Sequence, residues 1–220
     1  MKTASAKSKV RVFLVDDHPI VRRGFQLLLS LEPDLMVCGE ADNGPAALQK
    51  ILALKPDVAI VDLALKASSG LDLIKQVRAQ LSRMKILVFT MREEIIYAER
   101  ALRAGANGYI TKEEGTEKAI EAIRLLMQGK TCFSQPVADA MMARLTGKSS
   151  RAGGSLESLS DRELEVLDLI GNGHGSREIA QRLRISIKTV ESHREHIKTK
   201  LGLKSASELV KYAYNWVNER

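Results

Sequence analysis

Three aspartates in the first third of the chain follow short apolar runs, where their carboxylates are well placed to do chemistry. Asp16 and Asp17 come directly after the run 12–15, and Asp62 comes directly after the run 58–61. Runs of this length are typical of parallel strands that are buried on both faces. Because open α/β sheets place their ligands at the carboxyl ends of their strands, we expect the three carboxylates to lie close together.

Such a cluster needs a counter-ion, because two like charges about 4 Å apart repel by roughly 4 kcal/mol even at an effective dielectric of about 20. Mg²⁺ characteristically binds a few carboxylates and takes waters and phosphate oxygens as its other ligands. A carboxylate beside Mg²⁺ can also attack phosphorus and form an aspartyl phosphate. A single acid at a strand end is usually a loop cap, but three acids on two strands favour a Mg²⁺ and phosphoryl site.

Two further strand ends add a hydroxyl and a cation. Thr90 follows the run 86–89, and Lys112 closely follows the run 108–110. Alone, Thr90 would be interpreted as a helix cap and Lys112 as a surface residue. Their common position at strand ends favours contacts with phosphoryl oxygens, for which lysine serves as a point charge.

The elements that must position these residues alternate along residues 10–127. Helices are expected at 20–31, 45–54, 71–81, 94–104 and 117–127, between and after strands at 10–15, 36–39, 58–61, 86–89 and 108–110. Two of the expected apolar helix stripes are Leu71, Ile74 and Val77, and Ala119, Ile123, Leu126 and Met127. Alternation predicts an α/β fold, a doubly wound, flavodoxin-like five-stranded parallel sheet of order 2-1-3-4-5. Its switch point lies between the first and third strands, which carry the three aspartates.

The pattern changes after residue 128. A short helix at 137–145 and a Gly/Ser/Lys-rich linker at 146–155 precede a purely helical segment. Its expected helices begin after capping residues, with Ser160-Asp161-Arg162-Glu163 as a capping box, and cover 161–170, 177–183, 187–201 and 208–217. A short helix and a long one joined by a tight turn indicate a helix-turn-helix, although a generic helical bundle fits the periodicity equally well.

The expected helix 187–201 separates these two interpretations. Its apolar stripe is Ile187, Val190, Ile197 and Leu201. The opposite face carries polar groups able to contact base edges in a major groove, namely Lys188, Ser192, Glu195, His196 and Thr199. The flanks carry residues suited to phosphate contacts, namely Thr189, His193, Lys198 and Lys200.

Charge and composition narrow the class of protein. The formal net charge is +7, and residues 171–204 hold eight basic and three acidic groups. This excess favours a polyanion partner, with a solvated basic face as the alternative. No apolar run approaches the roughly 20 residues of a membrane span. Cys38 and Cys132 are far apart and predict free thiols in a reducing, cytoplasmic protein.

The first half resembles the receiver domain of bacterial two-component response regulators in Val15-Asp16-Asp17-His18-Pro19, Val61-Asp62-Leu63, Phe89-Thr90 and Gly108-Tyr109-Ile110-Thr111-Lys112, with matching order and spacing over residues 10–128. The resemblance implies that Asp62 accepts a phosphoryl group from a sensor histidine kinase. It implies Mg²⁺ ligands in Asp16, Asp17, Asp62 and the backbone carbonyl of Ala64. Thr90 and Lys112 would bind the phosphoryl oxygens, and Tyr109 would change rotamer on activation.

One stretch departs from that family pattern. Such receivers usually carry Met-Pro three residues after the acceptor, whereas this chain has Leu65-Lys66. Losing the proline loosens the loop, and the lysine adds a cation near the site. We therefore expect altered phosphorylation kinetics and not an inactive receiver, because the acid set is intact.

The second half resembles the four-helix LuxR-type DNA-binding domain in Leu159–Leu167, Glu178-Ile179-Ala180 and Ser186–His193. The whole chain is thus similar to a transcriptional regulator of the NarL/FixJ type, a non-enzyme. Its domains would be a receiver at 10–128, a linker with a short helix at 129–156, and a DNA-binding domain at 157–220. The implied DNA-binding residues are Ser186, Lys188, Thr189, Glu191, Ser192, His193, Glu195, Lys198 and Lys200.

In that family the positions of Glu191, Ser192 and Glu195 often face bases, and Glu191 could instead pair with Lys188 or Arg194. The last helix carries an apolar stripe of Leu209, Ala213 and Trp216. The resemblance implies that this helix forms the dimer on DNA, with packing in its own bundle as the alternative. The implied partners are promoter DNA, the kinase and a second copy after activation, with RNA polymerase a further candidate.

Two other functions compete with this reading. A Mg²⁺-dependent aspartyl-phosphate phosphatase would need an acid two residues after Asp62, where the chain has Ala64. A constitutive DNA binder with a receiver used only for protein contacts is supported only by the altered Leu65-Lys66 loop.

Overall fold

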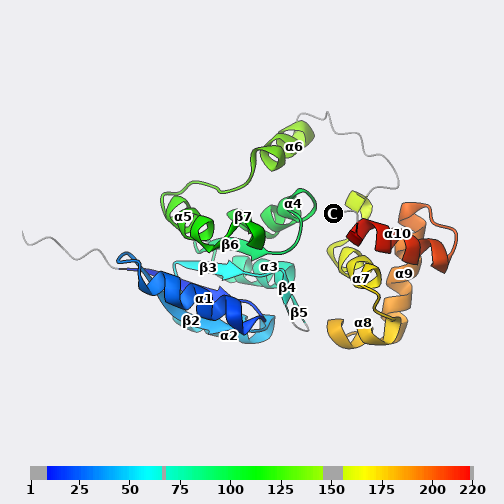
Figure 1. Cartoon of the computed structure of the whole chain (residues 1–220), viewed down its shortest axis with the longest axis horizontal. Helices are drawn as coiled ribbons and strands as arrows, with labels where there is room; N and C mark the ends of the chain where they lie inside the picture. Colours follow the sequence, from blue (N-terminus) through cyan, green and yellow to red (C-terminus); the bar gives the residue numbers. More distant parts are fainter. Residues whose placement is uncertain (1–8, 66–67, 146–155, 219–220) are drawn as a thin grey trace, which may run out of the picture. The chain divides into compact units, whose positions relative to one another are not determined.

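The computed structural model describes residues 9–65, 68–145 and 156–218, and the chain divides into two compact units, Met1–Met141 and Met142–Arg220. In the first unit, five parallel strands form one sheet in the order β2-β1-β3-β6-β7 (Figure 1). The strands are β1 Val10–Val15, β2 Leu35–Ala41, β3 Val58–Val61, β6 Lys85–Thr90 and β7 Gly108–Thr111. The helices around the sheet are α1 Pro19–Ser30, α2 Gly44–Leu54, α3 Gly70–Gln80, α4 Glu94–Ala104 and α5 Thr116–Met127. The predicted doubly wound sheet and its strand order are confirmed.

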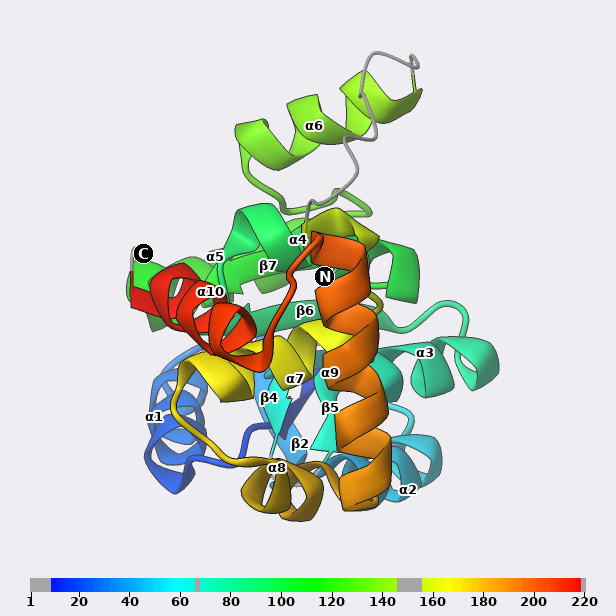
Figure 2. The same cartoon turned by 90° about the vertical axis from the view of Figure 1, so that its right-hand side faces the viewer.

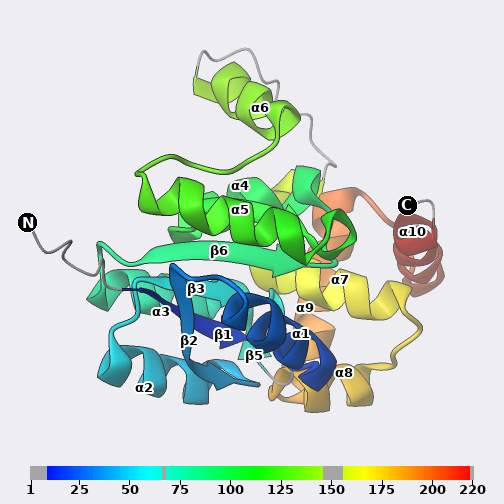
Figure 3. The ribbon, with the colours of Figure 1, turned by 60° about the vertical axis from the view of Figure 1, so that its left-hand side comes forward.

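The alternation of side chains along each strand divides the core into two layers. On one face, strand residues such as Leu14 and Ile60 pack with α1 and α5 in one buried cluster (Figure 3). Phe25 of α1 meets Phe89 of β6 edge to face, with ring centroids 5.0 Å apart. The alternate strand residues, such as the buried Phe13, point to the other face, where β1 contacts α2. Each such buried side chain contributes about 1.5–3 kcal/mol, so this sandwich fixes the strand ends in space.

The connection after β3 contains an antiparallel hairpin, β4 Ala64–Leu65 and β5 Ser68–Ser69, that the sequence does not predict. Strands of two residues are too short to show an apolar period. Gly70 follows at once and begins α3. A Cβ at Gly70 would lie 2.2 Å from the carbonyl oxygen of Asp62, so only glycine lets α3 begin against this strand end.

The second unit is helical (Figure 2). Its elements are the 3-10 turn η2 Leu156–Ser158 and helices α7 Asp161–Gly171, α8 Ser176–Leu183, α9 Ile187–Leu201 and α10 Ala206–Asn218. Buried residues from each helix form its core, namely Leu164, Leu167, Ile179, Val190, Ile197 and Leu209. The predicted Ser160–Glu163 capping box opens α7. The 3-10 turn η1 Lys112–Glu114 connects β7 to α5, and helix α6 Gln135–Leu145 follows α5 along the chain.

Several local predictions differ from the structure. Ile187 is 46% exposed and Met127 is 40% exposed, because a side chain in the first or last turn of a helix can project beyond the packed face. Helix α8 begins at Ser176 because the Glu178 side chain accepts from the backbone N–H of Gly175. Helix α10 begins at Ala206, two residues early, because Ser205 accepts from the N–H of Glu208.

Cys38 and Cys132 are both free thiols, as predicted. Among the described residues, none of the helices has the length and apolar character required to cross a membrane.

Candidate metal centre and nucleic-acid interface

Strand register brings the predicted acids to one edge of the sheet. Val15 of β1 pairs with Val61 of β3, so Asp16 and Asp62, the next residue of each strand, lie at the same level. Both carboxylates are buried, with residue exposures of 5% for Asp16 and 2% for Asp62. Asp17 is half-buried beside them, and one oxygen of each acid falls within a cluster 4.8 Å across. The predicted convergence of the three acids is therefore present.

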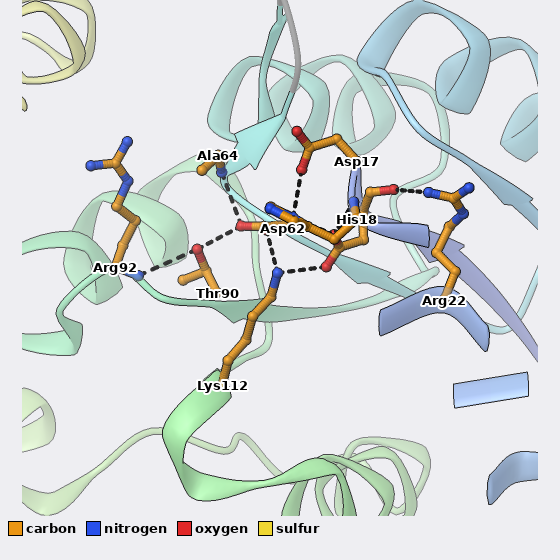
Figure 4. A network of polar contacts seen from close by, with 9 residues as sticks. Asp17, His18, Arg22, Asp62, Ala64, Thr90, Arg92 and Lys112 are labelled. Atoms are coloured by element: carbon orange, nitrogen blue, oxygen red, sulfur yellow. Dashed lines mark hydrogen bonds and ion pairs between the residues drawn. The ribbon is translucent and has the colours of Figure 1, made fainter. Parts of the chain in front are cut away.

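Lys112 and Thr90 complete this edge, as Figure 4 shows. The Lys112 ammonium lies 2.6 Å from Asp62 Oδ2 and 2.6 Å from Asp16 Oδ2, bridging the two strands. The Thr90 hydroxyl donates to Asp62 Oδ1 over 2.6 Å, and the backbone N–H of Ala64 donates to the same oxygen over 3.0 Å. Both oxygens of Asp62 are therefore held in place by short, direct contacts.

The charges at this edge do not balance, because one ammonium faces three carboxylates. Burial raises the pKa of Asp17, and the carboxylates of Asp62 and Asp16 raise it further, although His18 lowers it. Burial alone would lower the pKa of Lys112, but Asp62 and Asp16 outweigh it and leave that pKa raised. The three carboxylates therefore carry more negative charge than Lys112 neutralises, and the excess can be balanced by a further cation.

One oxygen of Asp17 accepts no hydrogen bond from any residue that the structure describes. Its Oδ1 is buried and lies 2.9 Å from His18 Nδ1, but this contact lacks the geometry of a hydrogen bond. A buried carboxylate oxygen without a hydrogen bond is uncommon and indicates a missing partner such as an ion. Oxygen-only carboxylate ligands suit a hard divalent cation, so these residues fit Mg²⁺.

Tyr109, on β7, lies near this edge and is 1% exposed. Its hydroxyl donates to the carbonyl oxygen of Arg92 over 2.9 Å. Arg92 also donates its backbone N–H to Thr90 Oγ1 over 3.4 Å, and its guanidinium lies over the ring of Tyr97 on α4. A chain of contacts thus runs from Asp62 through Thr90 and Arg92 to Tyr109 and α4.

The sequence did not indicate two residues of this site. The backbone N–H of His18 donates to Asp16 Oδ1 over 2.8 Å, and its ring joins the acid cluster. Arg22 of α1 donates to the backbone carbonyl of Asp16 over 2.6 Å. The adjacency of His18 to Asp17 was the available signal for the first, whereas the contact of Arg22 depends on how α1 packs.

The residue that replaces the family methionine, Leu65, is 8% exposed within the hairpin β4–β5. Leucine and methionine have similar volumes, so a buried leucine at this position is a mild change. Lys66 and Ala67 lie outside the described residues.

All nine predicted DNA-binding residues of the second unit lie on or directly before α9 and reach solvent. Six are exposed and three are half-buried, namely Ser186, Lys188, Glu191, Ser192, Glu195 and Lys200, and then Thr189, His193 and Lys198. Ser186 caps α9 by accepting from the N–H of Thr189 over 3.0 Å. A fifteen-residue helix with such an exposed polar face has the length and chemistry to enter a major groove.

The acids on this face have basic neighbours on α9 itself. Glu191 lies 3.7 Å from the guanidinium of Arg194, and Glu195 lies 2.9 Å from the ammonium of Lys198. Of the two partners considered for Glu191, the geometry places Arg194 beside it. The ammonium of Lys200 instead lies 2.6 Å from Glu163 Oε2 on α7, and this ion pair holds the Lys200 side chain in place.

Helix α10 has two different faces. Leu209 and Ala213 of the predicted stripe are fully buried in the bundle. Val210 and Tyr214 are 45% and 59% exposed and line a shallow cavity of about 500 Å³. Leu209 and Ala213 of the predicted stripe therefore pack within their own unit, whereas Val210 and Tyr214 form a separate, exposed apolar face.

Comparisons with known proteins support the interpretation of both halves of the chain. Residues 12–124 match the model of the response regulator receiver domain, and residues 157–213 match the model of bacterial regulatory proteins of the luxR family. Oxygen regulatory protein NreC of Staphylococcus aureus is 38% identical over 209 residues, covering 93% of this chain and 96% of that protein.

Solved structures give the same result. RcsB of Salmonella typhimurium is 26% identical over 94% of this chain and 98% of its own, with a TM-score of 0.71. RcsB of Salmonella enterica serovar Typhimurium, bound to promoter rprA in the presence of the phosphomimetic BeF3-, matches with 26% identity and a TM-score of 0.67, over 94% of this chain and 99% of that one. With a receiver and a luxR-type domain in one chain, this protein belongs to the two-component response regulators of the NarL/FixJ type.

Proposed function

We propose that this protein is a transcriptional regulator whose DNA binding is switched by Mg²⁺-dependent phosphorylation of Asp62. The observation that carries the proposal is the arrangement around Asp62, whose oxygens contact Thr90, Ala64 and Lys112 beside two further acids. A sensor histidine kinase would be the phosphoryl donor. One Asp62 oxygen attacks phosphorus, a P–O bond forms, and the P–N bond to the kinase imidazole breaks.

The proposed Mg²⁺ ligands are Asp16, Asp17, Asp62 and the backbone carbonyl of Ala64. When bound, the ion neutralises charge that builds up on the phosphoryl oxygens. Two short contacts hold the Lys112 ammonium at this edge, so it is placed to pair with an oxygen of the phosphoryl group on Asp62. The Thr90 hydroxyl, 2.6 Å from Asp62 Oδ1, can turn to donate to a phosphoryl oxygen.

The contacts of Thr90 supply a route for the signal. When Thr90 changes its partner, its contact with the Arg92 N–H changes too, and Arg92 comes two residues before α4. Tyr109 is bound to the Arg92 carbonyl and is already buried in this structure. We therefore propose that phosphorylation shifts a population of conformers in which Thr90, Tyr109 and the face of α4 change together.

For the second unit we propose that α9 binds the major groove of promoter DNA. Ser186, Lys188 and the other predicted residues would supply the contacts, and α10 would join two copies on paired half-sites. RcsB supports this proposal, because solved structures describe it bound to promoter DNA and as dimers bound to two parallel DNAs. RNA polymerase is a further proposed partner, and the cytoplasm is the proposed location.

The proposed domain bounds are 10–128 for the receiver, 129–156 for the linker and 157–220 for the DNA-binding domain. The phosphatase alternative has no support at position 64, because Ala64 has no acid to protonate a leaving group.

The phosphorylation step is tested by intact mass after incubation with Mg²⁺ and a small phosphodonor. Wild type should gain one phosphoryl adduct, and Asp62→Asn should gain none. Asp57→Asn is the matched control, because Asp57 lies just before the same strand and its side chain accepts from the N–H of Arg11. An adduct on Asp62→Asn, or none on wild type even with a cognate kinase, would contradict the proposal.

The switch is tested by DNA affinity with and without the phosphoryl mimic BeF3-, on DNA selected from a random library by the phosphorylated protein. Affinity should rise with the mimic in wild type and stay constant in Asp62→Asn. Equal affinity in both states of the wild type would favour the constitutive DNA binder instead.

A further inference from the structure

A second cluster of possible metal ligands lies in the helical unit. It consists of Glu163 on α7 and of His193 and His196 on α9. One ligand atom from each residue falls within 4.8 Å of the other two. The sequence predicts that His196 can contact base edges and that His193 can contact phosphates, so neither predicted role accounts for the cluster.

Helix geometry explains why the two histidines meet. Residues three apart lie on the same side of a helix, and the contact between α7 and α9 brings Glu163 against that side. His196 Nδ1 lies 3.6 Å from Glu163 Oε1. Two ligands of a tetrahedral Zn²⁺, each about 2.0 Å from the metal, are roughly 3.3 Å apart. This pair therefore needs little movement to share an ion.

The carboxylate of Glu163 is already oriented. Its Oε2 accepts from the backbone N–H of Ser160 over 2.7 Å and from the ammonium of Lys200 over 2.6 Å. These donors leave Oε1 directed toward His196. Outer contacts that hold a ligand in place in this way are typical of protein metal sites.

His193 supplies an independent observation. Its Nδ1 is buried and has no hydrogen-bond partner among the described residues. A buried nitrogen without a partner has a cost and indicates an absent water or ion. Burial lowers the pKa of His193, a shift in the direction of the neutral imidazole that binds metals.

We propose that Glu163, His193 and His196 form a binding site for Zn²⁺ that connects α7 to α9. Two imidazoles and one carboxylate make a donor set that suits zinc better than Mg²⁺, which prefers oxygen ligands alone. A water would fill the fourth position, since His196 is exposed and gives the ion a path from solvent. The site is distinct from the proposed Mg²⁺ site, so the two ions would bind independently.

The test uses Co²⁺ as a spectroscopic substitute for zinc on the full-length protein, with excess Mg²⁺ present to occupy the acid edge. Wild type should bind one Co²⁺ with the intense visible bands of a four-coordinate ion. His196→Gln should lose those bands and at least about tenfold in affinity, because even outer contacts of a metal site are worth about 10–100-fold. His196 is exposed, so this variant should fold.

His174→Gln is the matched control, because His174 also lies near a glutamate, 3.5 Å from Glu178, but outside the cluster. It should keep the bands. In addition, Zn²⁺ at about 100 times its Kd should raise the unfolding midpoint of wild type by on the order of 10 °C and leave His196→Gln unchanged. A weak six-coordinate spectrum, or equal spectra for wild type and His196→Gln, would overturn the proposal.

Discussion

The acid edge of the sheet and the outer face of α9 both carry charge, but they hold it in opposite ways. At the sheet edge, Asp16 and Asp62 are buried at the ends of separate strands, and both meet the half-buried Lys112 through short contacts. On α9, Glu191 and Glu195 are exposed and meet basic partners three residues away on the same helix. The first arrangement is rigid and electrically unbalanced, whereas the second is solvated and largely neutralised.

This difference separates the two tasks. Phosphoryl transfer benefits from groups fixed in advance in a site of low dielectric, where each charge has a large effect. A DNA-binding face must exchange water and counter-ions for phosphates, so its charges have to remain accessible. A mutation at the sheet edge should therefore change stability and chemistry strongly, and one on α9 should change mainly DNA binding.

The largest effect on the free energy of unfolding is expected from Lys112→Ala. Removing one partner of a buried ion pair typically costs about 3–5 kcal/mol, because the remaining charges stay buried without compensation. We expect a loss of about 3 kcal/mol in the unfolding free energy of the receiver without Mg²⁺, measured by urea denaturation. Mg²⁺ should restore more stability to the variant than to wild type, because the ion replaces the missing cation.

Lys118→Ala is the control for that experiment, since the exposed Lys118 pairs with Glu114 on the surface. It should change stability by less than about 1 kcal/mol. An equal loss for Lys112→Ala with and without Mg²⁺ would contradict the view that this edge is short of positive charge.

Glu163→Gln should have an intermediate effect on stability, because it removes a buried acid that binds α9 through Lys200. Glutamine also suits the third position of a capping box, so the variant mainly loses the charge pair with Lys200. We expect a loss of about 1–3 kcal/mol at pH 7 in the presence of a chelator. Urea unfolding of wild type and variant is the measurement.

The same variant should change the pH dependence of stability. Burial raises the pKa of Glu163, but hydrogen bonds from Lys200 and Ser160 outweigh burial and lower it below the ordinary 4.5. A lowered folded pKa contributes stability above pH 4.5 that is lost as the pH falls through the folded value. The gap between wild type and Glu163→Gln should therefore shrink below pH 4, and a constant gap down to pH 3 would be inconsistent with this linkage.

The acids at the sheet edge can be predicted from the sequence because each is marked by the few residues directly before it. An apolar run followed by an acid places Asp16 or Asp62 at a strand end, and parallel topology then brings the ends together. The hairpin of β4 and β5 is not predicted because two-residue strands have no period. The cluster of Glu163 with His193 and His196 is not predicted because Glu163 lies 30 or more positions before the two histidines and meets them only through the packing of α7 on α9.

The smallest expected effect on stability, and the sharpest test of the α9 face, comes from Glu195→Gln. The surface pair with Lys198 should contribute less than about 0.5 kcal/mol to stability. Removing the acid leaves Lys198 available to neutralise a phosphate. The slope of log K against log salt for DNA binding should then steepen by up to about 0.9, whereas Lys188→Ala should flatten it by a similar amount. Fluorescence anisotropy across a salt series measures both slopes. If Glu195→Gln left the slope unchanged and altered base preference instead, Glu195 would be contacting a base directly and its pairing with Lys198 would not persist on DNA.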